Sequence, residues 1–404
     1  MLKPDTLAFT LFLAILVSFG PVSTDMYLPS LPMIGAELNA DEASVQLTLS
    51  LFLVGFAFGQ IVYGPLSDRL GRRPLLIAGL LLYAFASLAC ALSPTIEVLI
   101  GARFLQAFGA AGPIVIARSM VRDVYEGSRA GKELALIGSL MGLVPAVAPT
   151  IGGVLQAAFG WPSSFVGTAV FGTLALVIVV FALGETLKTR QSGPLTVKSV
   201  VGGFGGLLGD PGYRAYVTIV CATFGGLFCF ISGSPFILQK IYGLSEIAYG
   251  VAFGLCALSY ATGAFIGQRI VSRRGIAALV RAGAVSVALA GVLMLAGVAF
   301  GPGHAAEIVV PMMVYMAGVG VGMPQAMAGA LMPFPDRAGA ASSLMGFLQM
   351  SSGAVVGVIF GHVIGDTAWP LAIAIALMGC VTLAAFWATR KARRAKSFIA
   401  PRHD

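Results

Sequence analysis

The sequence predicts an all-α polytopic membrane protein, on the basis of its composition and the length of its apolar segments. Of the 404 residues, 58% are hydrophobic and only 10% are charged, and the mean hydropathy is +0.92. A soluble domain carries about 25% charged residues, so this chain lacks the polar surface of a soluble fold. Each apolar segment is roughly 20 residues long, which is the length that crosses about 30 Å of hydrocarbon as a helix. A closed β-barrel would show shorter segments of alternating character.

Twelve apolar segments are expected to span the membrane. The longest polar interruption, residues 185–213, divides them into six and six. We therefore predict an N-terminal six-helix bundle (1–184), a cytoplasmic linker (185–213), a C-terminal six-helix bundle (214–389) and a basic cytoplasmic tail (390–404). The expected spans are residues 6–29, 44–65, 74–93, 96–117, 133–157, 162–184, 214–238, 246–268, 276–300, 306–331, 338–364 and 367–389.

The basic residues are distributed unevenly between the two sides of the predicted membrane. With the N-terminus inside, 23 of the 25 Lys and Arg residues fall in cytoplasmic segments, and only Arg103 and Lys240 do not. Cytoplasmic loops carry an excess of Lys and Arg, so this asymmetry predicts that both termini are cytoplasmic. The formal net charge of +8 arises from the same bias. It indicates contact with an anionic inner leaflet and not with nucleic acid.

An acidic residue, Asp25, lies near the outer end of the first apolar segment, ahead of Pro29 and Pro32. A carboxylate inside hydrocarbon costs about 2.5–3.5 kcal/mol on insertion scales, so it usually faces a partner or a watery cavity. Proline cannot donate the backbone hydrogen bond that continues a helix, so the segment is expected to bend or end there. Asp25 is then either an interfacial cap on a spanning helix or a proton or cation site at a cavity mouth.

A basic residue, Arg103, lies about two turns inside the fourth predicted span, at a depth broadly similar to that of Asp25. The other charged residues fall in loops or near the edges of spans. One acid and one base inside a bilayer make a natural pair. Two interpretations stay open: a structural ion pair that joins the first and fourth helices, or a working pair in which Asp25 takes up and releases protons.

The predicted turn between the second and third spans is rich in Gly and Arg. Residues 64–73 have the pattern G-x-L-x-D-R-x-G-R-R. Glycine permits a tight turn, and an aspartate among three arginines makes a charged cluster at the cytoplasmic face. This pattern resembles the loop signature of the major facilitator superfamily. Its residues in this chain are Gly64, Asp68, Arg69, Gly71, Arg72 and Arg73.

Other motifs resemble the same family. Residues 103–111 (R-x-x-Q-x-x-G-A-A) are similar to its fourth-helix motif, with Ala107 where Gly is usual. Residues 144–153 resemble the fifth-helix motif of its antiporters, with Ala148 where Gly is common. The expected antiporter-motif residues are Pro145, Pro149, Gly152 and Gly153.

One group within the family is suggested more closely. Residues 25–32 (D-M-Y-L-P-x-x-P) are similar to the first-helix signature of the bicyclomycin-resistance (Bcr/CflA) drug exporters. Residues 121–125 and 365–370 look like segments of the phenicol exporters in the same group. The second-half counterpart of the loop, residues 267–275, lacks the acid, so the motifs gather in the first half of the chain.

The resemblance implies two six-helix halves around a cavity near the midplane of a bacterial inner membrane, open alternately to each side. It also implies that Asp68 clasps the cytoplasmic ends of the halves together in the outward-open state, as part of a gate formed by the loop at 64–73. The fifth span has an interpretation from chemistry alone. Glycine lets backbones pack closely, and Pro145 and Pro149 can bend the helix, which suits a helix that slides during gating. Such packing is common in any helix bundle.

Proton-coupled drug export is the predicted function. A proton entering down a 100 mV potential releases about 2.3 kcal/mol. Asp25 is the acid that the sequence places inside the membrane; burial favours its neutral form and Arg103 its charged form, so movement of Arg103 or of a substrate could switch it. No cofactor is expected, because the proton gradient supplies the energy. The resemblance also bears on the substrate: some multidrug relatives have a second acid two turns earlier on the first helix, whereas residues 14–17 of this chain hold none. The resemblance therefore implies a neutral, aromatic or zwitterionic drug of the phenicol or bicyclomycin type and not a broad range of cations.

The walls of the cavity are expected to combine aromatic, methionine and amide side chains, which suit adaptable recognition of apolar compounds. Most such side chains in a membrane bundle serve packing alone. The candidates are Tyr27, Gln46, Phe224, Phe228, Phe230, Tyr260, Gln325, Met345, Gln349 and Met350.

Two alternatives to drug export are an importer or facilitator of the same fold and, much less favoured, a membrane-embedded enzyme. An enzyme needs nucleophiles, metal ligands or acid–base groups gathered in one place. The three histidines lack metal-ligand spacing, the five cysteines fall in apolar segments, and no ATP-binding loop pattern occurs. We expect no metal and no enzymatic activity. The expected partners are a small-molecule drug, protons and the lipid bilayer, and the chain is expected to act as a monomer.

Overall fold

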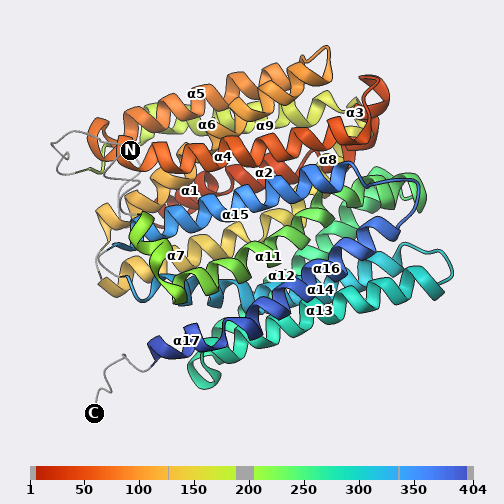
Figure 1. The fold of residues 1–404 in the computed structure, drawn as a ribbon. Coiled ribbons are helices and arrows are strands. Elements are labelled where there is room, and N and C mark those ends of the chain that lie inside the picture. Colours follow the sequence, from red (N-terminus) through yellow and green to blue (C-terminus); the bar gives the residue numbers. More distant parts are fainter. Residues whose placement is uncertain (1–5, 126, 188–203, 335–336, 398–404) are drawn as a thin grey trace. The chain divides into compact units, whose positions relative to one another are not determined.

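The structure is a computed structural model that describes residues 6–125, 127–187, 204–334 and 337–397 (Figure 1). Within those ranges it consists of helices and the turns that connect them, with no β-strand. Most of the predicted linker, including Lys188, Arg190 and Lys198, lies outside the described residues, as does the end of the predicted tail, 398–404.

The first span is a helix that is broken at residue 18 and again ahead of Pro29. It comprises α1 (Leu7–Val17), α2 (Phe19–Asp25), the 3-10 turn η1 (Leu28–Ser30) and α3 (Leu31–Glu37). The axis bends by 44° at residue 18. Pro21 explains the position of the bend, because it cannot donate to the carbonyl four residues earlier, where α1 ends.

The helix ends ahead of Pro29, as expected: α2 stops at Asp25, the residue whose carbonyl Pro29 cannot bond, and Met26 and Tyr27 form a turn. Pro29 and Pro32 then lie in new helical segments. Both residues lie at the first or second position of a short helix, where the missing N–H has no partner to lose. After the turn at 26–27, the chain therefore resumes helical form and keeps it to Glu37.

Four long helices follow the first span in the N-terminal part: α4 (Glu42–Leu70), α5 (Arg72–Ala91), α6 (Ile96–Val124) and α9 (Pro162–Ala182). The α4 helix packs on α6, and α5 packs on both α6 and α9. At Gly59, an added Cβ would collide with Ala111 of α6, so glycine permits this close approach. Asp41 caps α4 by accepting a hydrogen bond from the backbone N–H of Ser44 (2.9 Å), and hydrogen bonding from Ser44 keeps the pKa of Asp41 below its usual range.

The predicted fifth span, 133–157, is divided into α7 (Gly127–Met141) and α8 (Val144–Phe159). The interruption falls at Gly142 and Leu143, directly ahead of Pro145. Helix α7 ends at the residue whose carbonyl Pro145 cannot bond, as α1 does ahead of Pro21. A proline four residues downstream therefore sets the break in both spans.

The rest of the chain forms α11 (Pro211–Pro235), the π-helical turn η2 (Phe236–Ile241), α12 (Glu246–Arg274), α13 (Ile276–Phe300), α14 (Ala306–Leu331), α15 (Ala338–Gly361), α16 (Trp369–Ala388) and α17 (Arg390–Ser397). Ten helices in the described ranges are long and apolar enough to span a membrane, or eleven with the bent first span. The pair α7–α8 brings the number to twelve. The predicted class, an all-α polytopic membrane protein with twelve spans, is confirmed.

The chain divides into two compact units. Unit 1 contains the described residues up to 187 together with 235–254 and 357–362, and unit 2 contains the remaining described residues from 204 on. In unit 2, α13 packs on α14 and α16. The turn η2 and the start of α12 belong to unit 1, where Lys240 forms an ion pair with Glu42 at 2.8 Å and the Gln239 side chain donates to the carbonyl oxygen of Pro29. The predicted bundles 1–184 and 214–389 stay a prediction.

Candidate functional site

Arg103 is completely buried in unit 1, within a cage of aromatic rings. Its guanidinium carbon lies 4.2 Å from the ring centroids of both Tyr27 and Phe52 and 5.7 Å from that of Phe165. A cation over an aromatic face is stabilised by about 2 kcal/mol or more when water is excluded. The cage therefore offsets part of the cost of burying this charge. We call these three rings the aromatic cage.

Arg103 also joins a buried polar network. Its Nη1 donates to the backbone oxygen of Ser23 at 3.0 Å and to the side-chain oxygen of Gln106. Gln106 in turn donates to Ser87 on α5 at 2.7 Å and to Thr168 on α9 at 3.3 Å. The network ties α2, α5, α6 and α9 together around one arginine.

Two donors of Arg103, Nε and Nη2, have no hydrogen-bond partner among the described residues. Buried donors are costly when unpaired. These two are therefore free to bind a carboxylate, a water or a polar group of a substrate.

Asp25 is the last residue of α2 and is only 4% exposed. Its Oδ1 accepts a hydrogen bond from the Thr24 hydroxyl at 2.9 Å. Among the described ion pairs, none joins Asp25 to Arg103. Arg103 instead reaches the carbonyl oxygen of Ser23, two residues before Asp25. The direct pair expected from the sequence is not formed, because the aromatic cage and Gln106 hold the guanidinium.

The antiporter-motif residues of α8 pack against the backbone that follows Asp25. A Cβ at Gly152 would collide with the carbonyl oxygen of Met26, so glycine is required for this contact. The neighbouring Gly153 packs against the carbonyl of Glu246 in the same way, and Gly250 of α12 packs against the carbonyl of Pro149. The backbone beside Asp25 is thus in direct contact with α8, and α8 with the start of α12.

The loop at 64–73 forms a charged cluster in unit 1, centred on Arg72. Its guanidinium binds Asp68 (Nη1 to Oδ1, 2.6 Å) and makes two bonds to Asp123 at the end of α6 (2.8 and 3.3 Å). A bidentate arginine–carboxylate pair is among the stronger polar contacts in proteins. The backbone N–H groups of Arg72 and Arg73 donate to the Glu185 carboxylate at 3.0 and 3.1 Å, which caps α5.

The other loop-motif residues take separate roles. Gly71 has φ +103°, a backbone conformation that favours glycine. The carbonyl of Gly64 accepts from the Ser67 hydroxyl at 2.9 Å. Arg73 donates to the carbonyls of Val179 and Val180 in the last turn of α9. Arg69 makes no hydrogen bond or ion pair with the residues that the structure describes.

The predicted cavity residues are divided between the two units. Tyr27 and Gln46 lie in unit 1, and the rest lie in unit 2: Phe224, Phe228, Phe230, Tyr260, Gln325, Met345, Gln349 and Met350. Their common cavity stays a prediction.

Four of these residues have informative surroundings. Gln46 is fully buried, and neither atom of its side-chain amide has a partner among the described residues. Phe224 and Phe228 stack with their centroids 6.2 Å apart. Met345 is 1% exposed in an apolar cluster with Tyr213 and Val217. Its surroundings are those of a packing residue.

Sequence reasoning missed three acidic residues. Asp123 lies within the motif at 121–125, and Glu185 is the first residue of the predicted linker. Glu133 of α7 accepts a hydrogen bond from Thr10 of α1 at 2.8 Å. The predicted span 133–157 puts Glu133 at its edge, whereas Glu133 lies in the middle of the amphipathic helix α7, and this amphipathic pattern could have indicated it.

A model of the Major Facilitator Superfamily matches residues 8–357. The chain belongs to this superfamily. The family prediction made from the motifs is confirmed, and the chain is a multi-pass membrane transporter. Its structure is similar to the crystal structure of a POT family transporter in complex with 5-aminolevulinic acid, with TM-score 0.78 over 97% of each chain and 13% identity. At this identity the likeness shows the fold alone.

Several curated members of the superfamily are similar over nearly their whole length. The uncharacterized MFS-type transporter YdgK of Bacillus subtilis is 34% identical over 392 residues, 96% of this chain and 97% of YdgK. The bicyclomycin resistance protein homolog of Haemophilus influenzae is 28% identical over 95% of this chain and 96% of its own. The multidrug resistance protein MdtL of Escherichia coli O127:H6 is 32% identical over 90% of each. These similarities agree with the exporter group suggested by residues 25–32.

Proposed function

We propose that this transporter is a proton-coupled antiporter that exports small, mainly apolar or aromatic drugs, of the phenicol or bicyclomycin type, across the bacterial inner membrane. It would act as a monomer with both termini in the cytoplasm, and without a cofactor, because the proton gradient supplies the energy. Enzymatic catalysis is not part of the proposal. Two relatives named for bicyclomycin or multidrug resistance support the substrate class.

The observation that supports coupling most directly is the burial of Asp25 without a cation in contact. A buried carboxylate lacking a charged partner is costly, whereas its protonated form is not. Arg103 has two donors without a partner among the described residues. It also donates a hydrogen bond to the carbonyl oxygen of Ser23, two residues before Asp25. A small movement of α2 or a shift of the guanidinium would bring the carboxylate within reach of those donors. Proton release would then accompany formation of the pair.

Substrate binding would act on the same pair. A drug carbonyl or hydroxyl that accepts from Nε or Nη2 of Arg103 would compete with the Asp25 carboxylate. Displaced from Arg103, Asp25 would take up a proton. Drug binding and protonation would therefore be linked through a single guanidinium, as exchange of one for the other requires.

The test uses inside-out membrane vesicles energised by respiration, with a fluorescent reporter of the pH gradient. Phenicols, bicyclomycin and a few amphipathic cations are added in turn. With the unaltered chain, we expect one phenicol or bicyclomycin-type compound to dissipate the gradient. With Asp25→Asn, we expect at least a tenfold smaller response, because the amide cannot carry a proton.

Glu97→Gln is the matched control, since it removes an exposed carboxylate in the first turn of α6. It is expected to behave as the unaltered chain does. An Asp25→Asn variant that dissipates the gradient normally would make Asp25 a structural residue. Release of a preloaded compound from the vesicles together with protons would instead favour an importer of the same fold, because the lumen of an inside-out vesicle corresponds to the outside of the cell.

A further inference from the structure

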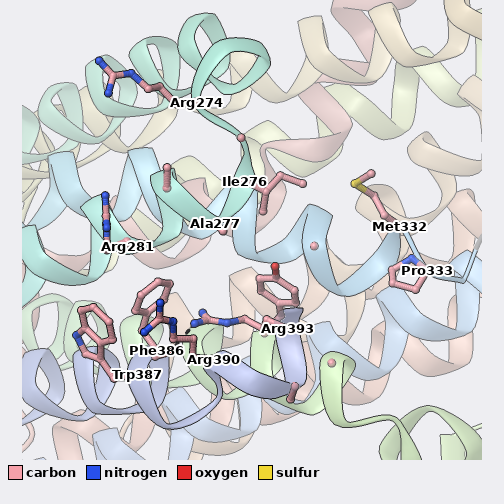
Figure 2. A pocket seen from close by; sticks show the side chains of 16 residues that line it. Arg274, Ile276, Ala277, Arg281, Met332, Pro333, Phe386, Trp387, Arg390 and Arg393 are labelled. Atoms are coloured by element: carbon pink, nitrogen blue, oxygen red, sulfur yellow. Dashed lines mark hydrogen bonds between the residues drawn. The ribbon is translucent and has the colours of Figure 1, made fainter. Parts of the chain in front are cut away.

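Unit 2 contains a cavity of about 750 Å³ at the ends of several helices. It is lined by the start of α11, the turn between α12 and α13, the end of α14, the end of α16 and the helix α17 (Figure 2). Four of its sixteen lining residues are arginines, and none is acidic: Arg274, Arg281, Arg390 and Arg393. We call this cavity the basic pocket.

Arg393 is the unusual member of the basic pocket. Arg393 is only 8% exposed. Its guanidinium carbon lies 3.8 Å from the ring centroid of Phe386 and 5.9 Å from that of Tyr216. Nη2 donates to the carbonyl oxygen of Phe386. The other two nitrogens, Nε and Nη1, are buried and have no hydrogen-bond partner among the described residues.

The buried charge of Arg393 and its two unpaired donors would be stabilised by a bound anion. A buried charge is costly unless it is paired and hydrogen-bonded. The ring of Phe386 covers one face of the guanidinium, and the Phe386 carbonyl accepts one hydrogen bond from it. Neither the ring nor the carbonyl carries a negative charge. Arg281 and Arg390 are exposed and line the same cavity, so they add positive potential and further donors. Arginine forks match the geometry of phosphate oxygens.

The remaining walls of the basic pocket are apolar. Ile276, Met332, Phe386 and Trp387 contribute to them, and Trp387 is 49% exposed at the last turn of a spanning helix. Tryptophan in such a position is typical of the boundary between headgroups and acyl chains. Cationic donors beside apolar and interfacial side chains suit an amphiphile, whereas a free ion needs only the donors.

We propose that the basic pocket binds the phosphate group of an anionic phospholipid, with Arg393 as its buried ligand and Arg281 and Arg390 as flanking ligands. Trp387 and Phe386 contact the start of the acyl chains. The phospholipid belongs to the inner leaflet, a placement that rests on the cytoplasmic orientation proposed above. Bound there, it joins α17 to α13 and α16, and so stabilises unit 2.

The experiment measures thermal unfolding of the purified full-length chain in mixed micelles, as phosphatidylglycerol, phosphatidylcholine or inorganic phosphate is added. Phosphatidylglycerol is expected to raise the unfolding midpoint in a saturable manner, and the other two probes are not. Arg393→Gln and Arg281→Gln are each expected to weaken the apparent affinity about tenfold, as loss of a charged hydrogen bond implies. Arg281 is exposed, so that second variant tests binding even where Arg393→Gln unfolds.

Arg269→Gln is the matched control, because Arg269 is exposed and stacks on an aromatic ring, Phe265, outside the basic pocket. It is expected to leave the affinity unchanged. The proposal is overturned by equal weakening in Arg269→Gln, by full affinity in Arg281→Gln, or by an equal effect of inorganic phosphate. The last result would make the basic pocket a site for a free anion. None of these readouts depends on drug transport.

Discussion

Among single side chains, Tyr27 has two separable roles beside Arg103. Its ring forms one wall of the aromatic cage, and its hydroxyl pairs with that of Thr48 at 3.0 Å. Thr48 also donates to the carbonyl of Val45, so it keeps a partner when the tyrosine hydroxyl is removed. The ring, and not the hydroxyl, should therefore matter for the position of Arg103.

Two substitutions at this residue test that view. Tyr27→Phe is expected to cost about 1 kcal/mol of stability, the value of one net hydrogen bond, and to retain at least half of the drug transport. Tyr27→Ala removes the ring and leaves a cavity, so we expect a loss of about 3–5 kcal/mol and of nearly all transport. Thermal unfolding and vesicle transport, compared at equal amounts of folded protein, measure both. Equal transport by the two variants would show that the aromatic cage does not position Arg103.

For helices, the contact between α8 and the first span decides how close Asp25 lies to the antiporter motif. The helix can approach only because Gly152 lacks a side chain opposite the Met26 carbonyl. Gly138 of α7, in the same predicted span, has no heavy atom within 4 Å of the position that a Cβ would take. The two glycines therefore make a matched pair.

We expect Gly152→Ala to lower the stability by about 1–3 kcal/mol, as overpacking does, and to reduce transport at least tenfold. Gly138→Ala should instead be neutral or stabilising by roughly 0.5–1 kcal/mol, because alanine favours a helix. Thermal unfolding midpoints and transport rates of the two variants provide the comparison. Loss of function in Gly138→Ala as well would mean that the span tolerates no added side chain, whatever its contacts.

For the chain as a whole, the orientation in the membrane follows from the charge bias of its loops. The C-terminus is expected inside and the turn between α13 and α14, residues 301–305, outside. Green fluorescent protein fused to the full-length chain should then fluoresce. Green fluorescent protein fused after Gly303 should not fluoresce, because green fluorescent protein folds poorly when it is exported. The opposite pattern would invert the topology and move the basic pocket to the outer leaflet.

Much of the candidate site could be predicted from the sequence. Asp25 and Arg103 stand out because charges are rare inside apolar segments. Gly152 stands out because its motif is dense in glycine and proline. The acids that bind Arg72 and the N-terminus of α5 were harder to find, since Asp123 and Glu185 are ordinary acidic residues at the ends of spans. Their role depends on which helix ends meet, and local pattern does not contain that information.

The class of protein, the twelve spans, the family and the charged positions inside the membrane could all be predicted from the sequence, because each depends on composition or on a local motif. The partners of those charged positions became known from the folded structure alone. It placed Arg103 among aromatic rings instead of against Asp25, and it left Arg393 buried with two unused donors. The physical reason is that hydropathy acts on each segment separately, whereas the pairing of a buried charge depends on side chains brought together from distant segments.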